Sequence, residues 1–213
     1  MDWSRYAIYW LPSGPLGRVG ARWLGWDVRA GTAIAGAAPE TERPRRYGFH
    51  ATIKPPFRLA PGVDDEQVRA AATALATGLE PVDLGPLSVT RLGRFLALTP
   101  ARNPADLAVA VVAGLDDLRA PATAEELARR RAVGLTPEQD ARLLRWGYPH
   151  VMDGFRMHLT LTGPDPAPGV DARAAEAFAG VSGPHRLDTL SLAGEGPDGR
   201  FRLIADLPLG GAA

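Results

Sequence analysis

The sequence contains two similar stretches, "YGFHATIKPPF" at residues 47–57 and "FRMHLTLTG" at residues 155–163. In each, a histidine is followed two places later by a threonine, within an alternation of apolar and polar residues that is typical of a β-strand. Side chains alternate across a strand, so residues i and i+2 share a face. The pattern therefore predicts that His50 and Thr52 point the same way, as do His158 and Thr160.

Each predicted strand has an apolar face for the protein interior and a polar face. The polar face also carries Lys54 in the first strand and Arg156 in the second. A single copy of this pattern is more typical of an ordinary half-solvated strand. Two copies, in a chain with only four histidines, favour a shared site.

The elements around the two stretches suggest an internal repeat. In both halves an expected helix follows the His-x-Thr strand, and two expected strands follow the helix. The matching segments are "LSV" at 87–89 with "LSL" at 190–192, and "RF" at 94–95 with "RF" at 200–201. This order predicts an α+β fold in which two mostly antiparallel sheets flank a central cleft, with helices outside.

We expect one bilobal domain over residues 1–213. The first lobe covers roughly 13–118 and a helical insert covers 119–150. The second lobe covers roughly 155–213 and takes in the N-terminal strand "RYAIYWLP".

The composition excludes several classes of protein. Lys+Arg and Asp+Glu both number 24, so the formal net charge is zero and there is no bulk attraction to long nucleic acid or an anionic membrane. The absence of cysteine excludes disulfides, thiolate nucleophiles and Cys-ligated zinc. The beginning of the chain is not expected to be a signal peptide, and no stretch approaches the ~18 apolar residues of a spanning helix. We expect a cytoplasmic monomer that needs no cofactor.

The paired motifs suit the chemistry of a phosphodiester. One imidazole can take a proton from water while the other gives a proton to the departing oxygen, since the usual histidine pKa is about 6.5. Threonine hydroxyls and a nearby cation can hydrogen-bond the non-bridging oxygens as charge builds. Two histidines without a placed carboxylate or cysteine are too few ligands for a metal, so none is expected.

Longer runs around the motifs resemble the 2H phosphoesterase superfamily, which includes RNA-ligase-like and cyclic-nucleotide phosphodiesterases. They are most similar to a branch associated with phosphonate metabolism, often encoded beside carbon–phosphorus lyase genes. The runs are "RYAIYWLP", "RRYGFHATIKPPFRLAPG", "RFLALTPA", "LDDLRAPATAEELARRR" and "LTPEQDARLLRWGYPHVMDGFRMHLTLTGP".

The resemblance implies the bilobal fold of that superfamily, a central cleft and no required metal. It implies that His50 and His158 are the acid/base pair and that Thr52 and Thr160 bind phosphate oxygens. Which histidine is the base stays open. The implied activity is hydrolysis of a small cyclic phosphodiester, such as a nucleoside or ribosyl cyclic phosphate, to a monoester.

Five further residues are weaker candidates. Lys54 could contact phosphate or be a solvated strand end, and Arg156, on the face of His158, has the same two interpretations. Tyr47 could line the mouth of the cleft or only make a loop soluble. Arg130 belongs to an arginine-rich segment that could hold a substrate phosphate or face solvent. Tyr148 could stack on a base or sugar or pack in the core. An alternative function is a non-catalytic nucleotide- or RNA-binding module that uses the same cleft.

Overall fold

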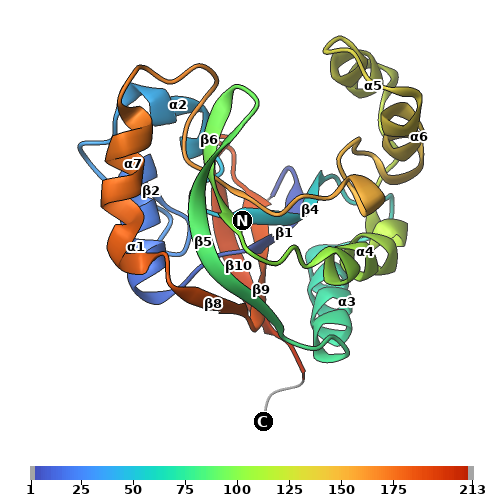
Figure 1. Ribbon diagram of the computed structural model, residues 1–213. Coiled ribbons are helices and arrows are strands. Elements are labelled where there is room, and N and C mark those ends of the chain that lie inside the picture. Colours follow the sequence, from blue (N-terminus) through green and yellow to red (C-terminus); the bar gives the residue numbers. More distant parts are fainter. Residues whose placement is uncertain (1–2, 211–213) are drawn as a thin grey trace.

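The computed structural model describes residues 3–210 and contains an eight-stranded antiparallel sheet that is curled, with helices around it (Figure 1). The strand order is β10-β9-β1-β4-β7-β6-β5-β8. The strands are β1 (Tyr6–Trp10), β4 (Ala51–Phe57), β5 (Val82–Leu92), β6 (Phe95–Pro100), β7 (Leu159–Thr160), β8 (Pro184–Leu187), β9 (Thr189–Glu195) and β10 (Phe201–Pro208). A two-stranded ribbon is formed by β2 (Trp26–Asp27) and β3 (Thr32–Ala33).

The sheet has two halves that meet where β4 pairs with β7, with Ala51 opposite Leu159. One half contains β1, β9 and β10 beside β4, and the other contains β6, β5 and β8 beside β7. Each half therefore draws strands from both chain ranges expected for the lobes. The α+β class and the antiparallel strands predicted from the sequence are confirmed, and the halves form one continuous sheet. The first two and last three residues of the expected domain lie outside the described residues.

The helices are α1 (Gly14–Leu24), α2 (Glu42–Arg45), α3 (Asp65–Thr77), α4 (Ala105–Gly114), α5 (Ala124–Arg131), α6 (Pro137–Trp146) and α7 (Val170–Phe178). Helices α1, α3, α4 and α7 all contribute to the large core and lie along the two flanks of the curled sheet in Figure 1. Short 3-10 turns are η1 (Pro39–Thr41), η2 (Asp116–Leu118), η3 (Met152–Gly154) and η4 (Ala179–Val181). In Figure 1, α1 and α7 flank the half that contains β5, and α3 and α4 flank the opposite side. The helices α5 and α6 form the insert between η2 and β7.

Local sequence signals explain where the insert helices begin and end. Thr123 and Thr136 each accept a hydrogen bond from a backbone N–H three residues later, and the Glu or Gln at that position bonds back to the threonine N–H. Such reciprocal capping boxes satisfy donors that a helix start leaves unpaired. The helix α6 ends at Gly147, whose φ of 74° gives a left-handed cap.

The strand β1 separates two apolar clusters. Tyr6, Ile8 and Trp10 belong to the large core that packs against α3, α4 and α7. Ala7 and Tyr9 belong to a smaller cluster on the other face of the sheet, together with Phe201. The polar side chains of both His-x-Thr motifs lie on the face of Tyr9. Within the described range, none of the helices has the length and apolarity that crossing a membrane requires.

Candidate functional site

The register of β4 and β7 brings the two His-x-Thr motifs together. Ala51 pairs with Leu159, and both side chains point into the large core. Because the strands are antiparallel, continuing this register by one residue in each direction sets His50 opposite Thr160 and Thr52 opposite His158. Directly opposite Cβ atoms on one face are about 4.5–5.5 Å apart. The four polar side chains therefore form a square, with the two histidines at diagonal corners.

The hydrogen bonds of His50 define its tautomer. Nδ1 lies 2.9 Å from the carbonyl oxygen of Gly48, and since a carbonyl only accepts, Nδ1 carries the hydrogen. Nε2 lies 3.0 Å from the hydroxyl of Thr52 and accepts from it. The neutral ring thus presents an Nε2 lone pair on the side of Thr52, as a general base requires.

The environment of His50 favours its neutral form. Burial lowers the pKa of His50 to about 4, although the Gly48 carbonyl acts in the opposite direction and the charge of His158 acts in the same direction. His50 as a whole residue is half-buried. Its imidazole is therefore neutral at the pH of most cells.

The second motif has a more open environment. Nδ1 of His158 lies 2.8 Å from the carbonyl oxygen of Arg156, so Nδ1 again carries the hydrogen and Nε2 points away from the backbone. The ring of Phe95, on β6, lies 5.6 Å from the imidazole between centroids. The Thr160 hydroxyl has no hydrogen-bond partner among residues 3–210, which leaves it available to a ligand.

Lys54 is not where strand alternation places it. A β-bulge interrupts the β1–β4 pairing, so that Tyr9 faces Thr52 while Ile8 faces Lys54, with Ile53 as the extra residue. Lys54 consequently points to the opposite face from Thr52. The prediction that Lys54 contacts phosphate is therefore wrong.

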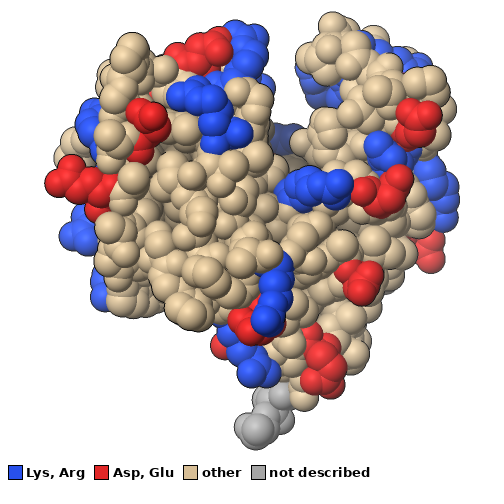
Figure 2. Space-filling view, viewed as in Figure 1, with Lys and Arg blue, Asp and Glu red and all other residues tan. Residues whose placement is uncertain are grey.

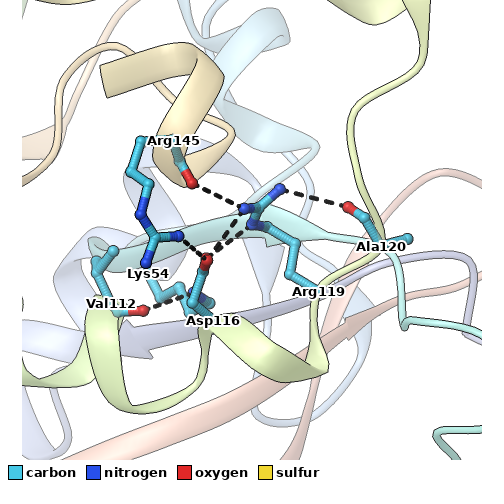
Figure 3. Close-up of polar contacts among 6 residues, drawn as sticks. All are labelled: Lys54, Val112, Asp116, Arg119, Ala120 and Arg145. Carbon is cyan, nitrogen blue, oxygen red and sulfur yellow. Dashed lines mark hydrogen bonds and ion pairs between the residues drawn. The ribbon is translucent and has the colours of Figure 1, made fainter. Parts of the chain in front are cut away.

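The Lys54 ammonium is buried beneath α4 (Figure 3). Nζ donates to the carbonyl oxygen of Val112 at 2.9 Å and lies 3.6 Å from Oδ1 of Asp116. Asp116 also accepts from Arg119 at 2.8 Å and from Arg145 at 3.1 Å. Because Arg145 lies on α6, this network joins the helical insert to the strand that carries the first motif.

The other residues that the sequence suggested as substrate contacts are Tyr47, Arg130, Tyr148 and Arg156. The ring of Tyr47 lies 6.2 Å from that of His50. The guanidinium of Arg130 lies 4.7 Å from the centre of the Tyr148 ring. Arg156 is exposed, and its guanidinium donates to the carbonyl oxygen of Phe155 at 2.8 Å. Tyr47 thus lies beside His50, Arg130 and Tyr148 contact each other, and Arg156 curls back onto its own backbone.

Two features of the site escaped prediction although β1 itself was expected. The ring of Tyr9 lies 3.9 Å from that of His50, and Arg5 forms a two-pronged ion pair with Glu195 at 2.6 and 2.7 Å. Arg5 directly precedes β1 and is four residues from Tyr9, so the two share a face of this extended run. The signal in the sequence that could have found both residues is the alternation in "RYAIYWLP", which places Arg5 and Tyr9 on the same face of the strand.

A notch opens between the part that carries α2 and α7 and the part that carries α5 and α6 (Figure 2). Blue atoms of Lys and Arg are visible on both of its walls, and β4 runs between the same two parts in Figure 1. In residues 3–210, no three His, Cys, Asp or Glu side chains gather in a way that could hold a metal ion. The site therefore offers imidazoles, hydroxyls and guanidinium groups to an anionic ligand.

The curated relatives that this chain matches are longer than the chain itself. A protein of Janthinobacterium sp. (strain Marseille) named "Ribose 1,5-bisphosphate phosphokinase PhnN" is 36% identical over 217 residues, covering 90% of this chain and 48% of the relative. A protein of Laribacter hongkongensis (strain HLHK9) with the same name is 34% identical over 170 residues, covering 74% of this chain and 40% of the relative. The chain spans about half the length of the curated relatives it matches.

Solved structures of similar extent are related at low sequence identity. The crystal structure of TT0787 of Thermus thermophilus is 13% identical with a TM-score of 0.49, covering 98% of this chain and 100% of that one. The crystal structure of E. coli LigT in apo form is 14% identical with a TM-score of 0.46, covering 98% and 99%. A family described as "Protein of unknown function (DUF1045)" matches residues 52–202, which include β7 and all of β4 except its first residue, Ala51. The chain belongs to this family.

Proposed function

We propose that this protein is a phosphodiesterase of the two-histidine type, which hydrolyses a small cyclic phosphodiester to a monoester without a metal. The observation that carries the proposal is the crosswise placement of His50, Thr160, Thr52 and His158 across the β4–β7 pair. Two imidazoles at diagonal corners of one small square suit a reaction at a single phosphorus. In such a reaction the attacking and leaving oxygens lie roughly in line on opposite sides.

The tautomer of His50 supports its assignment as the base in hydrolysis. Its Nε2 takes a proton from a water molecule while the water oxygen bonds to phosphorus. The bond from phosphorus to the departing ring oxygen breaks, and His158, in its protonated form, gives that oxygen a proton through Nε2. With substrate bound, the Thr52 hydroxyl turns from Nε2 of His50, which frees that lone pair for the water, and donates to a non-bridging oxygen, as the Thr160 hydroxyl does. The products are a phosphomonoester and a free hydroxyl, and proton exchange with water restores both imidazoles.

A ribose-based substrate is the class that we favour. The curated relatives are named for a kinase of ribose 1,5-bisphosphate, and this chain matches about half of their length. Opening a cyclic phosphate on a phosphorylated ribose yields a ribose phosphate ester of that general kind. This supports a role for the chain beside ribose phosphate chemistry, and with it the link to phosphonate metabolism.

The test is a panel of 2′,3′-, 1,2- and 3′,5′-cyclic phosphates, assayed with and without EDTA. We expect turnover that survives EDTA and falls by about 10²-fold or more in His50→Ala and in His158→Ala. Circular dichroism of both variants checks that they remain folded. Loss of all activity in EDTA, or full rates in both folded variants, would overturn the mechanism. Tight binding without turnover would instead favour a nucleotide- or RNA-binding module.

A further inference from the structure

Arg129 and Arg130, both on α5, are the arginines of the helical insert that have no carboxylate partner within residues 3–210, and Arg129 is exposed. The other arginines in and beside the insert are paired: Arg131 with Asp140, Arg142 with Asp153, Arg58 with Glu126, and Arg119 and Arg145 with Asp116. Arg130 is half-buried nonetheless, with its guanidinium 4.7 Å from the centre of the Tyr148 ring. A guanidinium held out of water without an anion is a costly arrangement that a bound anion would relieve.

The charges around Arg130 do not supply that anion. Burial lowers the pKa of Arg130, and the positive charges of Arg129 and Arg5 add to this effect. Glu126 has the opposite effect, but its carboxylate already accepts from Arg58 at 3.0 Å and caps the start of α5. Arg5, in turn, is occupied by Glu195. Arg130 is therefore half-buried while no carboxylate of residues 3–210 forms an ion pair with it.

Arg130 lies on α5 and Tyr148 follows α6, in the part of the molecule that forms one wall of the notch (Figures 1 and 2). Burial raises the pKa of Tyr148, the phenol of Tyr47 acts in the same direction, and the charges of Arg130 and Arg43 oppose the increase. Arg43 lies on α2 and Tyr47 follows it, in the part that forms the other wall of the notch (Figures 1 and 2). Tyr47 lies 6.2 Å from His50, ring to ring. The notch thus lies between the wall that carries the Arg130–Tyr148 pair and the wall that carries Tyr47 beside His50.

We propose that Arg130 and Tyr148 form a second anion subsite, which holds a phosphomonoester carried by the substrate away from its cyclic phosphate. This inference rests on the proposed function and narrows its substrate class to sugar or nucleoside cyclic phosphates with a separate phosphate group. The guanidinium donates two parallel hydrogen bonds to the phosphate oxygens, and the Tyr148 hydroxyl donates a third. Tyr148 keeps the guanidinium plane facing the notch.

The experiment compares two substrates that differ only in the second phosphate: adenosine 2′,3′-cyclic phosphate and its 5′-phosphorylated form. We expect the wild type to prefer the phosphorylated substrate in kcat/KM. In Arg130→Gln this preference should fall about tenfold or more, as for the loss of a charge-assisted hydrogen bond. The matched control is Arg129→Gln, on the same helix and exposed, which should keep the preference. An unchanged preference in Arg130→Gln, or equal losses in both variants, would overturn the subsite.

Binding separates failure of the subsite from failure of the proposed function. In a His50→Ala/His158→Ala background, titration calorimetry with ribose 5-phosphate and with ribose should show binding of the phosphate ester only. Adding Arg130→Gln should abolish that binding, whereas adding Arg129→Gln should not. Binding of this pattern without any cyclic-phosphate turnover would refute the phosphodiesterase and retain the subsite. No binding of ribose 5-phosphate, or binding of adenosine in its place, would refute the subsite and favour a base-stacking platform.

Discussion

The ring of Tyr9 lies against the imidazole of His50, with 3.9 Å between ring centroids and 32° between ring planes. Tyr9 is completely buried on β1, opposite Thr52 in the register of β4. Its hydroxyl has no hydrogen-bond partner among the described residues. Burial raises the pKa of Tyr9 well above its usual value, so the phenol stays neutral. We infer that the Tyr9 ring positions His50 through contact of the two rings.

Substitutions at Tyr9 should separate the ring from the hydroxyl. In Tyr9→Phe an unpartnered buried hydroxyl is removed, so the free energy of unfolding should stay the same or rise by about 1 kcal/mol. Tyr9→Leu removes the contact between the rings and should lower the free energy of unfolding by about 1–3 kcal/mol. It should also reduce kcat, because His50 loses its fixed orientation. Urea denaturation and steady-state kinetics measure both effects. An equal loss of stability in the two variants would show that the hydroxyl has a partner.

His50 should titrate far below an ordinary histidine. NMR of its ring Cε1–H signal should give a pKa of about 4, and the acidic limb of kcat/KM should follow this value. Because the charge of His158 lowers the pKa of His50, His158→Ala should raise it. His185→Ala is the control, since His185, on β8, bonds to the Val181 carbonyl and should leave the value unchanged. A His50 pKa near 6.5 would contradict the burial that the site depends on.

The same shift predicts how stability depends on pH. The pKa of His50 is about 6.5 in an unfolded chain and about 4 in the folded protein, so the unfolded state binds the extra proton. The His50 contribution is thus fully present above pH 6.5 and is lost as the pH falls toward 4. Denaturant titrations across this range should show a shallower decline in His50→Gln than in the wild type. Equal slopes in the two proteins would argue against a buried His50.

Lys54 and Asp116 should be energetically coupled. Burial lowers the pKa of Lys54 to about 8, and Asp116 opposes this decrease. Asp116→Ala leaves a buried ammonium without its counter-charge and should cost about 3 kcal/mol of unfolding free energy. Lys54→Met/Asp116→Ala should recover much of that loss, because the thioether chain fills the same space without a charge.

The control for this cycle is Asp117→Ala, which removes an adjacent, exposed carboxylate and should change stability by less than about 0.5 kcal/mol. Chemical denaturation of the two single variants and the double variant gives the coupling energy. A double variant whose loss equals the sum of the single losses would mean that Lys54 is held by Val112 alone. The insert would then be joined to β4 more weakly than Figure 3 indicates.

The alternation of apolar and polar residues predicted which side chains share a face, but it did not predict how the strands pair. Period-two alternation placed His50 and Thr52 on one face because that rule depends only on neighbouring residues. The register that sets Ala51 opposite Leu159 joins segments 108 residues apart, and nothing local in the sequence encodes it. The expected convergence was therefore attributed to facing lobes, whereas the motifs lie on adjacent strands of one sheet.

Lys54 shows where the alternation rule stops. Its position two residues after Thr52 predicted a shared face, and the bulge at Ile53 reverses it. A bulge depends on how a strand pairs with its neighbour, here β1, so the sequence of β4 alone does not show it. Arg130 shows a different limit, since four arginines between 119 and 131 look alike in sequence. Ion pairs of the folded chain set two of them apart, and burial distinguishes Arg130 from the exposed Arg129.

Gly48 should be indispensable to the first motif. Its φ is +72°, which an alanine adopts at a cost of about 1–2 kcal/mol, and an added Cβ would lie 2.0 Å from Cγ2 of Val28. Gly48→Ala should therefore lower the unfolding free energy by about 3 kcal/mol or more. It should also displace the carbonyl that holds Nδ1 of His50, so kcat should fall in the fraction that remains folded.

Gly62→Ala is the matched control for this substitution. Gly62 has a φ of +84° but no atom within 4 Å of an added Cβ, so it isolates the backbone cost at about 1–2 kcal/mol. Adding Val28→Ala to Gly48→Ala removes the clash and should restore part of the stability, although the backbone cost remains. Equal losses at Gly48 and Gly62, or no rescue by Val28→Ala, would show that steric contact with Val28 does not hold Gly48 in place. The kcat of the Gly48→Ala/Val28→Ala variant then shows whether the carbonyl of residue 48 still orients His50. Stability depends on the space around the Cβ atom, whereas the orientation of His50 depends on the carbonyl oxygen.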